Sequence, residues 1–93
     1  MDWQYIDAET EEQFCRVEYF GLKKLQDGEE IEFLVLMREY LHPPDPSMKF
    51  FAQADKQTNQ KHVPYTPCGW GPDRHTALWE CVQAIRKFRY EPT

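Results

Sequence analysis

The residues of this 93-residue chain that could carry chemistry lie mostly in its last third. Cys68, His75 and Cys81 are the first candidates for a metal site, with Cys15 or His62 as further ligands. Zinc ligands usually come in close pairs such as Cys-x2-Cys, whereas six and five residues separate these three. Cys81 also falls on the apolar side of a predicted helix, where a small buried thiol is typical. We therefore predict no metal site.

Cys68 precedes the start of that helix and could act as a thiol nucleophile. A helix N-terminus lowers the pKa of a nearby thiol, and His75, one turn into the helix, would be its base. The sequence offers no group to orient such a base, and a chain of this length has little room for a cleft. We therefore expect no catalysis and no cofactor, and we interpret Cys68 as a packed loop residue.

The segment Gly69-Trp70-Gly71 could bind an anion through its free N–H groups before the helix. However, Pro72 lacks an N–H group and Asp73 places a negative charge at the same point. We interpret the two glycines as a tight turn and Trp70 as a plug at the edge of the core.

The element that must position these groups is a helix between Pro72 and Pro92. Pro72 suits its first turn, Asp73 can cap it, and Pro92 is expected to stop it. Its apolar arc is formed by Ala77, Leu78, Cys81, Val82, Ala84, Ile85 and Phe88. The opposite side carries a stripe at 4-3-4 spacing, namely Trp79, Gln83, Arg86 and Tyr90. Tryptophan, arginine and tyrosine are enriched in binding hot spots, so the stripe is a candidate partner-binding surface.

The dipeptide Asp27-Gly28 predicts a hairpin, because both central residues of a type I′ turn need positive φ. The strands are expected over 14–26 and 29–42. With a two-residue loop, the numbers of opposed residues sum to 55, which sets Leu22 against Phe33, Phe20 against Val35, Lys23 against Glu32 and Arg16 against Glu39. Apolar residues then meet apolar residues and opposite charges meet, as cross-strand pairing prefers.

Both faces of this hairpin carry apolar side chains. The face expected to receive the helix has Phe20, Leu22, Ile31, Phe33, Val35 and Met37. The other face has Cys15, Val17, Tyr19, Leu34, Leu36 and Tyr40, whereas a solvated face would alternate to polar residues. We predict that Tyr19, Leu34, Leu36 and Tyr40 bind a partner. The alternative is that the N-terminal segment, with Trp3 and Tyr5, covers this face.

The remaining segments complete a small sheet. A third strand is expected over Met48–Asp55, with Phe50 and Phe51 on opposite faces, and a short fourth strand over Val63–Thr66. The predicted fold class is α+β, an antiparallel β-meander of three to four strands with one C-terminal helix packed on one face. Residues 1–93 form a single domain. The order of elements is similar in outline to that of small antitoxin-like and double-stranded-RNA-binding-like domains.

The charge is unevenly distributed along the chain. Residues 1–46 carry 12 acids and 4 bases, and residues 47–93 carry 4 acids and 7 bases, which gives the net charge of −5. A strongly acidic half disfavours binding to a nucleic-acid backbone. The alternative function is nevertheless a nucleic-acid or small-anion site in residues 50–71, using Lys56, Lys61, Tyr65 and Trp70.

The sequence therefore predicts a small interaction module that associates with itself or binds a protein partner. No run of 18 apolar residues occurs and the N-terminus does not resemble a secretory signal, so we expect a cytoplasmic protein without a membrane partner. Three cysteines without framework spacing fit reduced thiols in that compartment.

Overall fold

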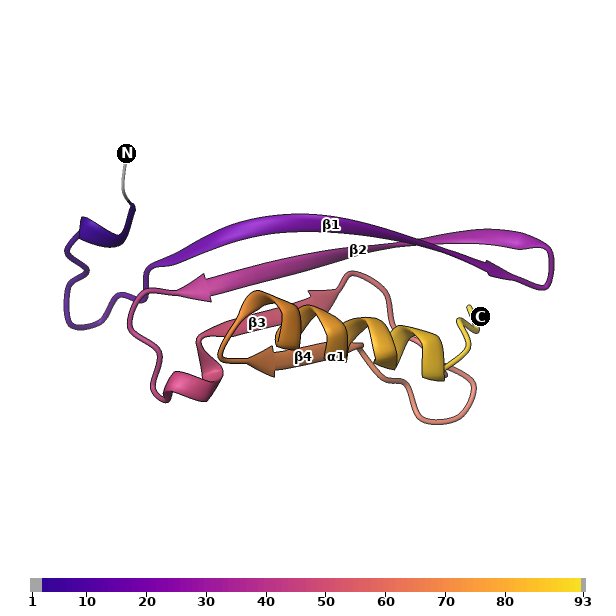
Figure 1. The fold of residues 1–93 in the computed structure, drawn as a ribbon. Coiled ribbons are helices and arrows are strands. Elements are labelled where there is room, and N and C mark those ends of the chain that lie inside the picture. The colour runs from indigo at the N-terminus through magenta and orange to yellow at the C-terminus, as the bar shows by residue number, and fades with distance from the viewer. Residues whose placement is uncertain (1–2, 93) are drawn as a thin grey trace.

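A computed structural model describes residues 3–92 as one four-stranded antiparallel sheet with a single helix packed against one face (Figure 1). The strands follow one another in the order β1-β2-β3-β4. The elements are β1 (Cys15–Gln26), β2 (Glu29–Tyr40), β3 (Phe50–Ala54), β4 (Cys68–Gly71) and α1 (Arg74–Lys87), with 3-10 turns η1 (Trp3–Tyr5) and η2 (Pro46–Met48). The predicted α+β meander with a C-terminal helix is confirmed. No helix within residues 3–92 is long and apolar enough to cross a membrane.

The long hairpin of β1 and β2 has the register that the sequence predicts. Leu22 lies opposite Phe33 and Lys23 opposite Glu32, and the pairing runs without interruption from Gln26 to the start of β1. Asp27 and Gly28 have φ values of 52° and 77°, as the type I′ turn requires. The hairpin is longer than the rest of the sheet, because β3 pairs only with residues 35–39 of β2. Its turn therefore projects beyond β3 and β4 (Figure 1).

The fourth strand lies further along the chain than predicted. It is formed by Cys68–Gly71, whereas the predicted segment Val63–Thr66 contributes only an isolated bridge between Tyr65 and Thr58. The interpretation of Gly69 and Gly71 as a tight turn is therefore wrong.

Both glycines are strand residues that face α1. A Cβ atom at Gly69 would lie 2.4 Å from the carbonyl oxygen of Ala77, and one at Gly71 would lie 2.7 Å from Cβ of Thr76. The helix backbone thus packs directly against the backbone of β4, which a side chain at either position would prevent.

The helix begins where its cap predicts. Asp73 has an extended backbone, and its Oδ1 accepts a hydrogen bond from the backbone N of Thr76 at 2.8 Å. This bond lowers the pKa of the Asp73 carboxyl, because it stabilises the ionised form. Pro72 precedes the cap and so lies outside the first turn that we expected it to occupy.

The helix ends earlier than Pro92, contrary to prediction. Phe88 already has an extended backbone, with φ −113° and ψ 142°. Lys24 of β1 reaches the helix end, and its Nζ donates to the carbonyl oxygens of Ile85 and Phe88, each at 2.9 Å. A cation at this negative helix end satisfies carbonyl groups that have no intrahelical partner.

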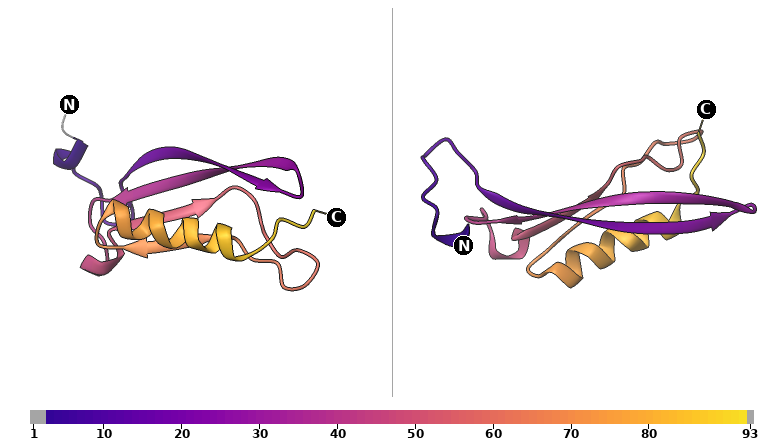
Figure 2. Two further views of the ribbon diagram at one scale, coloured as in Figure 1. Left: turned by 45° about the vertical axis from the view of Figure 1, so that its right-hand side comes forward. Right: turned by 90° about the horizontal axis from the view of Figure 1, so that it is seen from above.

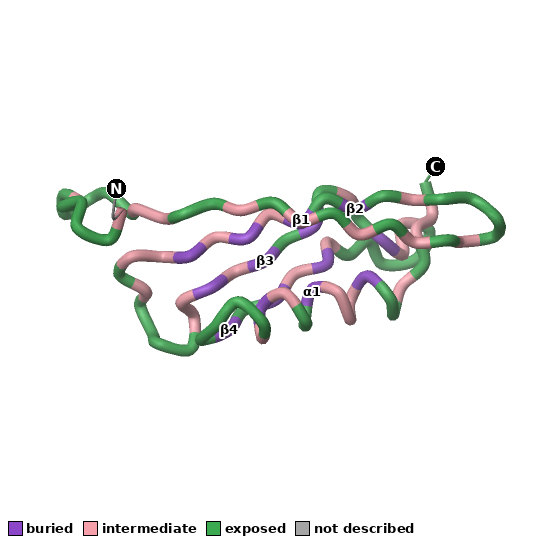
Figure 3. The backbone as a smooth tube through the Cα atoms, turned by 45° about the horizontal axis from the view of Figure 1, so that its top comes forward, coloured by how far each residue is buried: buried purple, intermediate pink, exposed green. Residues whose placement is uncertain are grey.

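The core lies between α1 and the facing side of β2 and β3 (Figure 3). Its buried members are Phe33, Val35, Met37, Phe50, Ala52, Ala54, Ala77, Cys81 and Ile85. The buried position of Cys81 is as predicted. Phe20, Leu22 and Ile31 are only partly buried against this core, because the helix lies mainly along β3 and β4.

Candidate interaction surface

The sheet face opposite α1 carries a continuous group of apolar and aromatic side chains. We call it the open face and define it by Val17, Tyr19, Leu34, Leu36, Arg38, Tyr40, Phe51 and Trp70. These residues alternate along their strands with the ones that face the core. Tyr19 is 70% exposed and Leu34 is 44% exposed, so the structure leaves the predicted second face in contact with solvent.

Trp70 forms an aromatic cluster on the open face. Its ring centroid lies 4.3 Å from that of Phe51 and 6.1 Å from that of Tyr40, and the second pair is stacked. Trp70 therefore does not plug the core, as we expected, because its position in β4 alternates with two core-facing glycines. Phe50 and Phe51 lie on opposite faces of β3, as predicted.

Arg38 lies in the middle of this surface. It is opposed by Val17 on one side and Phe51 on the other, and Phe51 is in turn opposed by Trp70, so these residues form one row across all four strands. Its guanidinium Nη1 lies 3.5 Å from Sγ of Cys15. Within residues 3–92, no carboxylate lies within salt-bridge distance of Arg38. A cation among apolar side chains is the feature of this face that the sequence alone did not reveal.

The N-terminal segment does not cover the exposed part of the open face. Trp3 stacks on Phe14 at 6.0 Å, and η1 lies beyond the start of β1 at one end of the sheet (Figure 2). A shallow depression at that end is lined by Trp3, Gln4, Glu39, Tyr40, Leu41 and Lys49. Tyr5 is almost fully exposed. The alternative prediction, in which this segment shields Tyr19 and Leu34, is therefore wrong for residues 3–13.

The outer side of α1 presents a second, smaller surface. Trp79 is 50% exposed; the His75 ring stacks on it at 6.2 Å, and the Arg86 guanidinium lies over it at 5.5 Å. Gln83 is half-buried and lines a shallow depression with Tyr65. Three members of the predicted stripe thus lie on the outer side of the helix, and the tryptophan already has neighbours on both sides.

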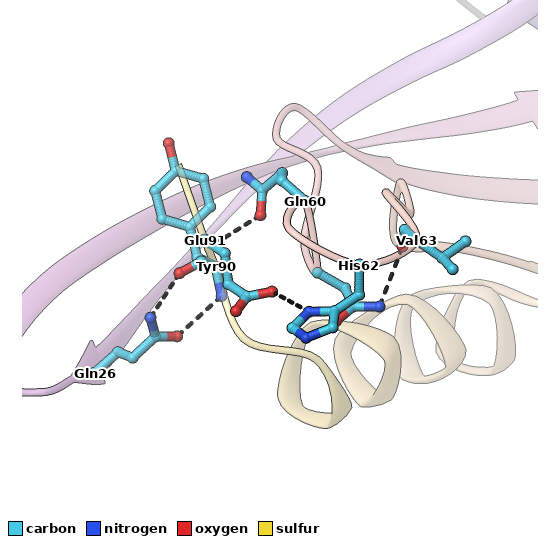
Figure 4. Close-up of polar contacts among 7 residues, drawn as sticks. Gln26, Gln60, His62, Val63, Tyr90 and Glu91 are labelled. Carbon is cyan, nitrogen blue, oxygen red and sulfur yellow. Dashed lines mark hydrogen bonds and ion pairs between the residues drawn. The ribbon is translucent and has the colours of Figure 1, made fainter. Parts of the chain in front are cut away.

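Tyr90 does not belong to that stripe. Its backbone N donates to Oε1 of Gln26 at 3.0 Å, and its carbonyl oxygen accepts from Nε2 of the same side chain at 2.8 Å (Figure 4). Its ring meets Phe33 edge-on at 6.1 Å. The helical spacing from which we placed Tyr90 no longer applies, because α1 ends at Lys87. Tyr90 therefore packs against the hairpin.

The four residues of the predicted nucleic-acid or anion site do not come together. Lys56 pairs with its neighbour Asp55 at 3.0 Å, and Lys61 lies in the exposed loop between β3 and β4. Tyr65 packs against Phe88 at the end of α1, with ring centroids 5.3 Å apart. Trp70 lies on the open face. This loop is instead fastened to the C-terminal segment, since the backbone N of Glu91 donates to Gln60 and its carboxylate meets His62 (Figure 4).

Cys68 and Cys81 lie near each other, but His62 and His75 have other partners. Cys68 lies in β4 rather than at the helix start, and His75 stacks on Trp79. Burial, and secondarily Cys68, raises the pKa of the Cys81 thiol to about 12, so it stays protonated at neutral pH. No group of three histidine, cysteine or acidic residues that could hold a metal ion occurs in the described part of the chain.

Neither a family model, a curated protein nor a solved structure matches this chain. Its function has to be inferred from the geometry, and the open face is the largest feature that the core does not explain.

Proposed function

We propose that this chain is a non-catalytic interaction domain that binds a protein partner through the open face. The observation that carries the proposal is the exposure of a contiguous apolar and aromatic surface on the sheet side opposite α1, with Tyr19 and Leu34 as its most exposed members. Contiguous patches of this kind mark interaction sites, whereas single exposed apolar residues need no explanation. Tyrosine, tryptophan and arginine, which dominate binding hot spots, all occur within it.

Arg38 specifies the chemistry of the partner. A protein that covers the open face removes water from this guanidinium, and a buried cation without a partner is costly. The partner surface should therefore be apolar and should present a carboxylate near the centre, opposite Arg38. The bidentate geometry of arginine with a carboxylate would also fix the orientation of the complex.

The same face has aromatic rings on a sheet, as single-stranded nucleic-acid platforms do. Such platforms combine their aromatic rings with several cations that follow the phosphate backbone. The open face has Arg38 at its centre and the whole chain is acidic. Near the projecting part of the hairpin, Lys23 and Lys56 are paired with the carboxylates of Glu30 and Asp55, so they do not form a row of free cations. The charge therefore supports a protein partner.

Photo-crosslinking in the native host tests the proposal. A benzophenone amino acid replaces Tyr19 on the open face, and Val63, which is equally exposed in the loop between β3 and β4, gives the matched control. We expect a discrete protein adduct from position 19 that position 63 does not give. Arg38→Glu should abolish that adduct while leaving the circular dichroism spectrum unchanged.

Two results would contradict the proposal. The first is the same set of adducts from both positions, which would show that the open face has no preferred partner. The second is an adduct at position 19 that nuclease removes, which would identify the ligand as nucleic acid.

A further inference from the structure

The second unexplained feature is the outer edge of the sheet, which β1 forms along its full length (Figure 2). Proteins usually protect such edges with short strands, prolines or bulges, because unpaired peptide groups attract another strand. β1 has 12 residues, contains no proline, and keeps an unbroken register with β2. These backbone protections are therefore missing, although β1 carries the charged side chains Arg16, Glu18, Lys23 and Lys24, which are another form of protection.

Alternate residues of β1 direct their peptide groups away from β2. The residues that flank a two-residue turn, here Gln26 and Glu29, form a hydrogen-bonded pair. At the other end, the backbone N of Leu41 donates to the carbonyl oxygen of Phe14 at 3.0 Å. Phe14, like Gln26, is an even-numbered residue. The even-numbered residues thus bond to β2, and the odd-numbered ones present N–H and C=O groups to the outside. These groups have no backbone partner within residues 3–92.

We propose that two copies of this chain pair antiparallel through β1, centred on Gly21, so that their sheets become continuous. The two-fold axis is perpendicular to the sheet, and both helices lie on the same side. In this register the numbers of opposed residues sum to 42. It sets Val17 against Leu25, Tyr19 against Lys23, Glu18 against Lys24, Phe20 against Leu22 and Gly21 against its own copy.

The pairs are self-complementary, which is why the partner is a second copy. Apolar residues meet apolar residues, and acid meets base, and symmetry makes each contact occur twice. Lys24 uses two of its three Nζ donors on the end of α1, so the third is left for Glu18. Within one copy, Oε1 of Glu18 already pairs with Arg74 and Arg16, so Lys24 of the second copy would meet Oε2. Leu25, which is 75% exposed, gains Val17 as a neighbour.

Neighbouring registers with the same hydrogen-bond parity lack this match. A sum of 40 sets Arg16 against Lys24 twice, and like charges directly opposed are unfavourable. A sum of 44 keeps apolar pairs, with Leu22 against its own copy and Tyr19 against Leu25. It loses the ion pair, because Lys24 then lies opposite Phe20 and Glu18 opposite Gln26. Pairing about Gly21 is therefore the register that the side chains favour.

The dimer goes beyond the proposed function and does not depend on it, because its hydrogen bonds come from peptide groups at the β1 edge. Val17 and Tyr19 of the open face would flank the seam. The dimer would join the two open faces into one surface. Phe20 and Leu22, which α1 leaves only partly buried, would gain neighbours from the second copy on the helix side.

Sedimentation equilibrium and amide hydrogen exchange on the purified full chain test this inference. We expect a reversible dimer in which the amides of Val17, Tyr19, Gly21 and Lys23 are protected at high concentration and exchange freely on dilution. Gly21→Pro removes an outward N–H that has no partner within one copy, so the fold should persist while dimerisation weakens at least about tenfold. Gly21→Ala, which keeps the N–H group and meets only Glu32 Oε1 at 3.6 Å, is the matched control.

The register has its own test, because Val17 and Leu25 are both exposed within one copy. Val17→Asp should weaken the dimer, and adding Leu25→Lys should restore it. The new aspartate of one copy lies opposite the new lysine of the other only in the register in which the numbers of opposed residues sum to 42. A monomer at millimolar concentration would overturn the inference. The inference would also be overturned if Gly21→Pro left the dimer intact. It would be overturned as well if Val17→Asp combined with Leu25→Lys did not restore the dimer. A failed crosslink from the open face would leave each of these outcomes unchanged.

Discussion

Replacing Gly69 by alanine should destabilise the domain strongly, although the same exchange in an ordinary strand is neutral or favourable. The new Cβ atom would lie 2.4 Å from the carbonyl oxygen of Ala77 and 2.9 Å from the backbone N of Cys81. Ordinary contact begins near 3.4 Å, and backbone atoms cannot rotate away, so α1 must withdraw by about 1 Å. A gap of that size forfeits about a quarter to a half of the dispersion energy at the atoms that it separates.

The expected cost is about 3 kcal/mol, the upper end of the range for overpacked cores. In a domain of this size it corresponds to a decrease in Tm of about 12 to 24 °C. Urea unfolding followed by circular dichroism measures the free energy, and a thermal scan measures Tm. Gly21→Ala in the same sheet is the control, since its Cβ meets only Glu32 Oε1 at 3.6 Å, and it should be neutral or slightly stabilising. If the two alanine variants were equally stable, the close packing of α1 on β4 would be refuted.

Three further predictions concern single side chains. Lys24→Met should lower the free energy of unfolding in urea by about 1 to 2 kcal/mol, because two charge-assisted hydrogen bonds to the end of α1 are lost. Lys23→Met, at an exposed neighbouring position, should change this free energy little. Equal effects of the two substitutions would exclude the capping role of Lys24. The pKa of Asp73 is lowered from 3.8 in the folded state, so its contribution is complete above that value and is lost as the pH falls through the lower folded pKa. The stability difference between the wild type and Asp73→Asn should therefore be constant above about pH 5 and shrink below pH 4; a difference that is the same at all pH values would contradict the cap. The Cys81 thiol is protonated and buried, so iodoacetamide at pH 8 should modify at most two of the three cysteines in the native protein. In urea it should modify all three, and mass spectrometry counts the additions. Three additions to the native protein would show that this part of the core opens.

The hairpin could be predicted from the sequence in detail because two independent signals agree on it. Asp27-Gly28 fixes the length of the turn, and the turn fixes which residues oppose each other. The cross-strand matches support the same register, since apolar residues then meet apolar residues and opposite charges meet. The start of α1 was predictable for a similar reason, because the cap at Asp73 and the apolar arc coincide.

The fourth strand was not predictable because its defining contacts are tertiary. Gly69 and Gly71 are typical of a turn when they are considered locally, and only the position of α1 explains why a strand needs residues without side chains there. The end of α1 has a tertiary contact of the same kind, since the Lys24 side chain that binds its carbonyl groups comes from a position 61 residues away in the chain.

The hairpin part of the open face was predictable and its extension onto β3 and β4 was not. Tyr19, Leu34, Leu36 and Tyr40 follow from alternation in the hairpin alone. Phe51 and Trp70 join them only because β3 and β4 continue the same sheet, and this order of strands brings Arg38 to the centre. The nucleic-acid candidates do not lie together for the converse reason, since Tyr65 and Trp70 are close in sequence but pack against different elements, Tyr65 on Phe88 and Trp70 on Phe51.

The contacts between the projecting hairpin and the C-terminal segment determine the order in which this chain can fold. Gln26 holds both backbone groups of Tyr90, and Arg89 pairs with Asp27, so the first hairpin is completed by residues more than 60 positions later. Contacts of such long range form late, because the entropy of closing the intervening loop must be overcome first. During synthesis the turn of the hairpin would therefore remain loosely held until residue 90 had emerged. Arg89 and Tyr90 therefore fix the turn of the hairpin only after the other elements of the domain are in place.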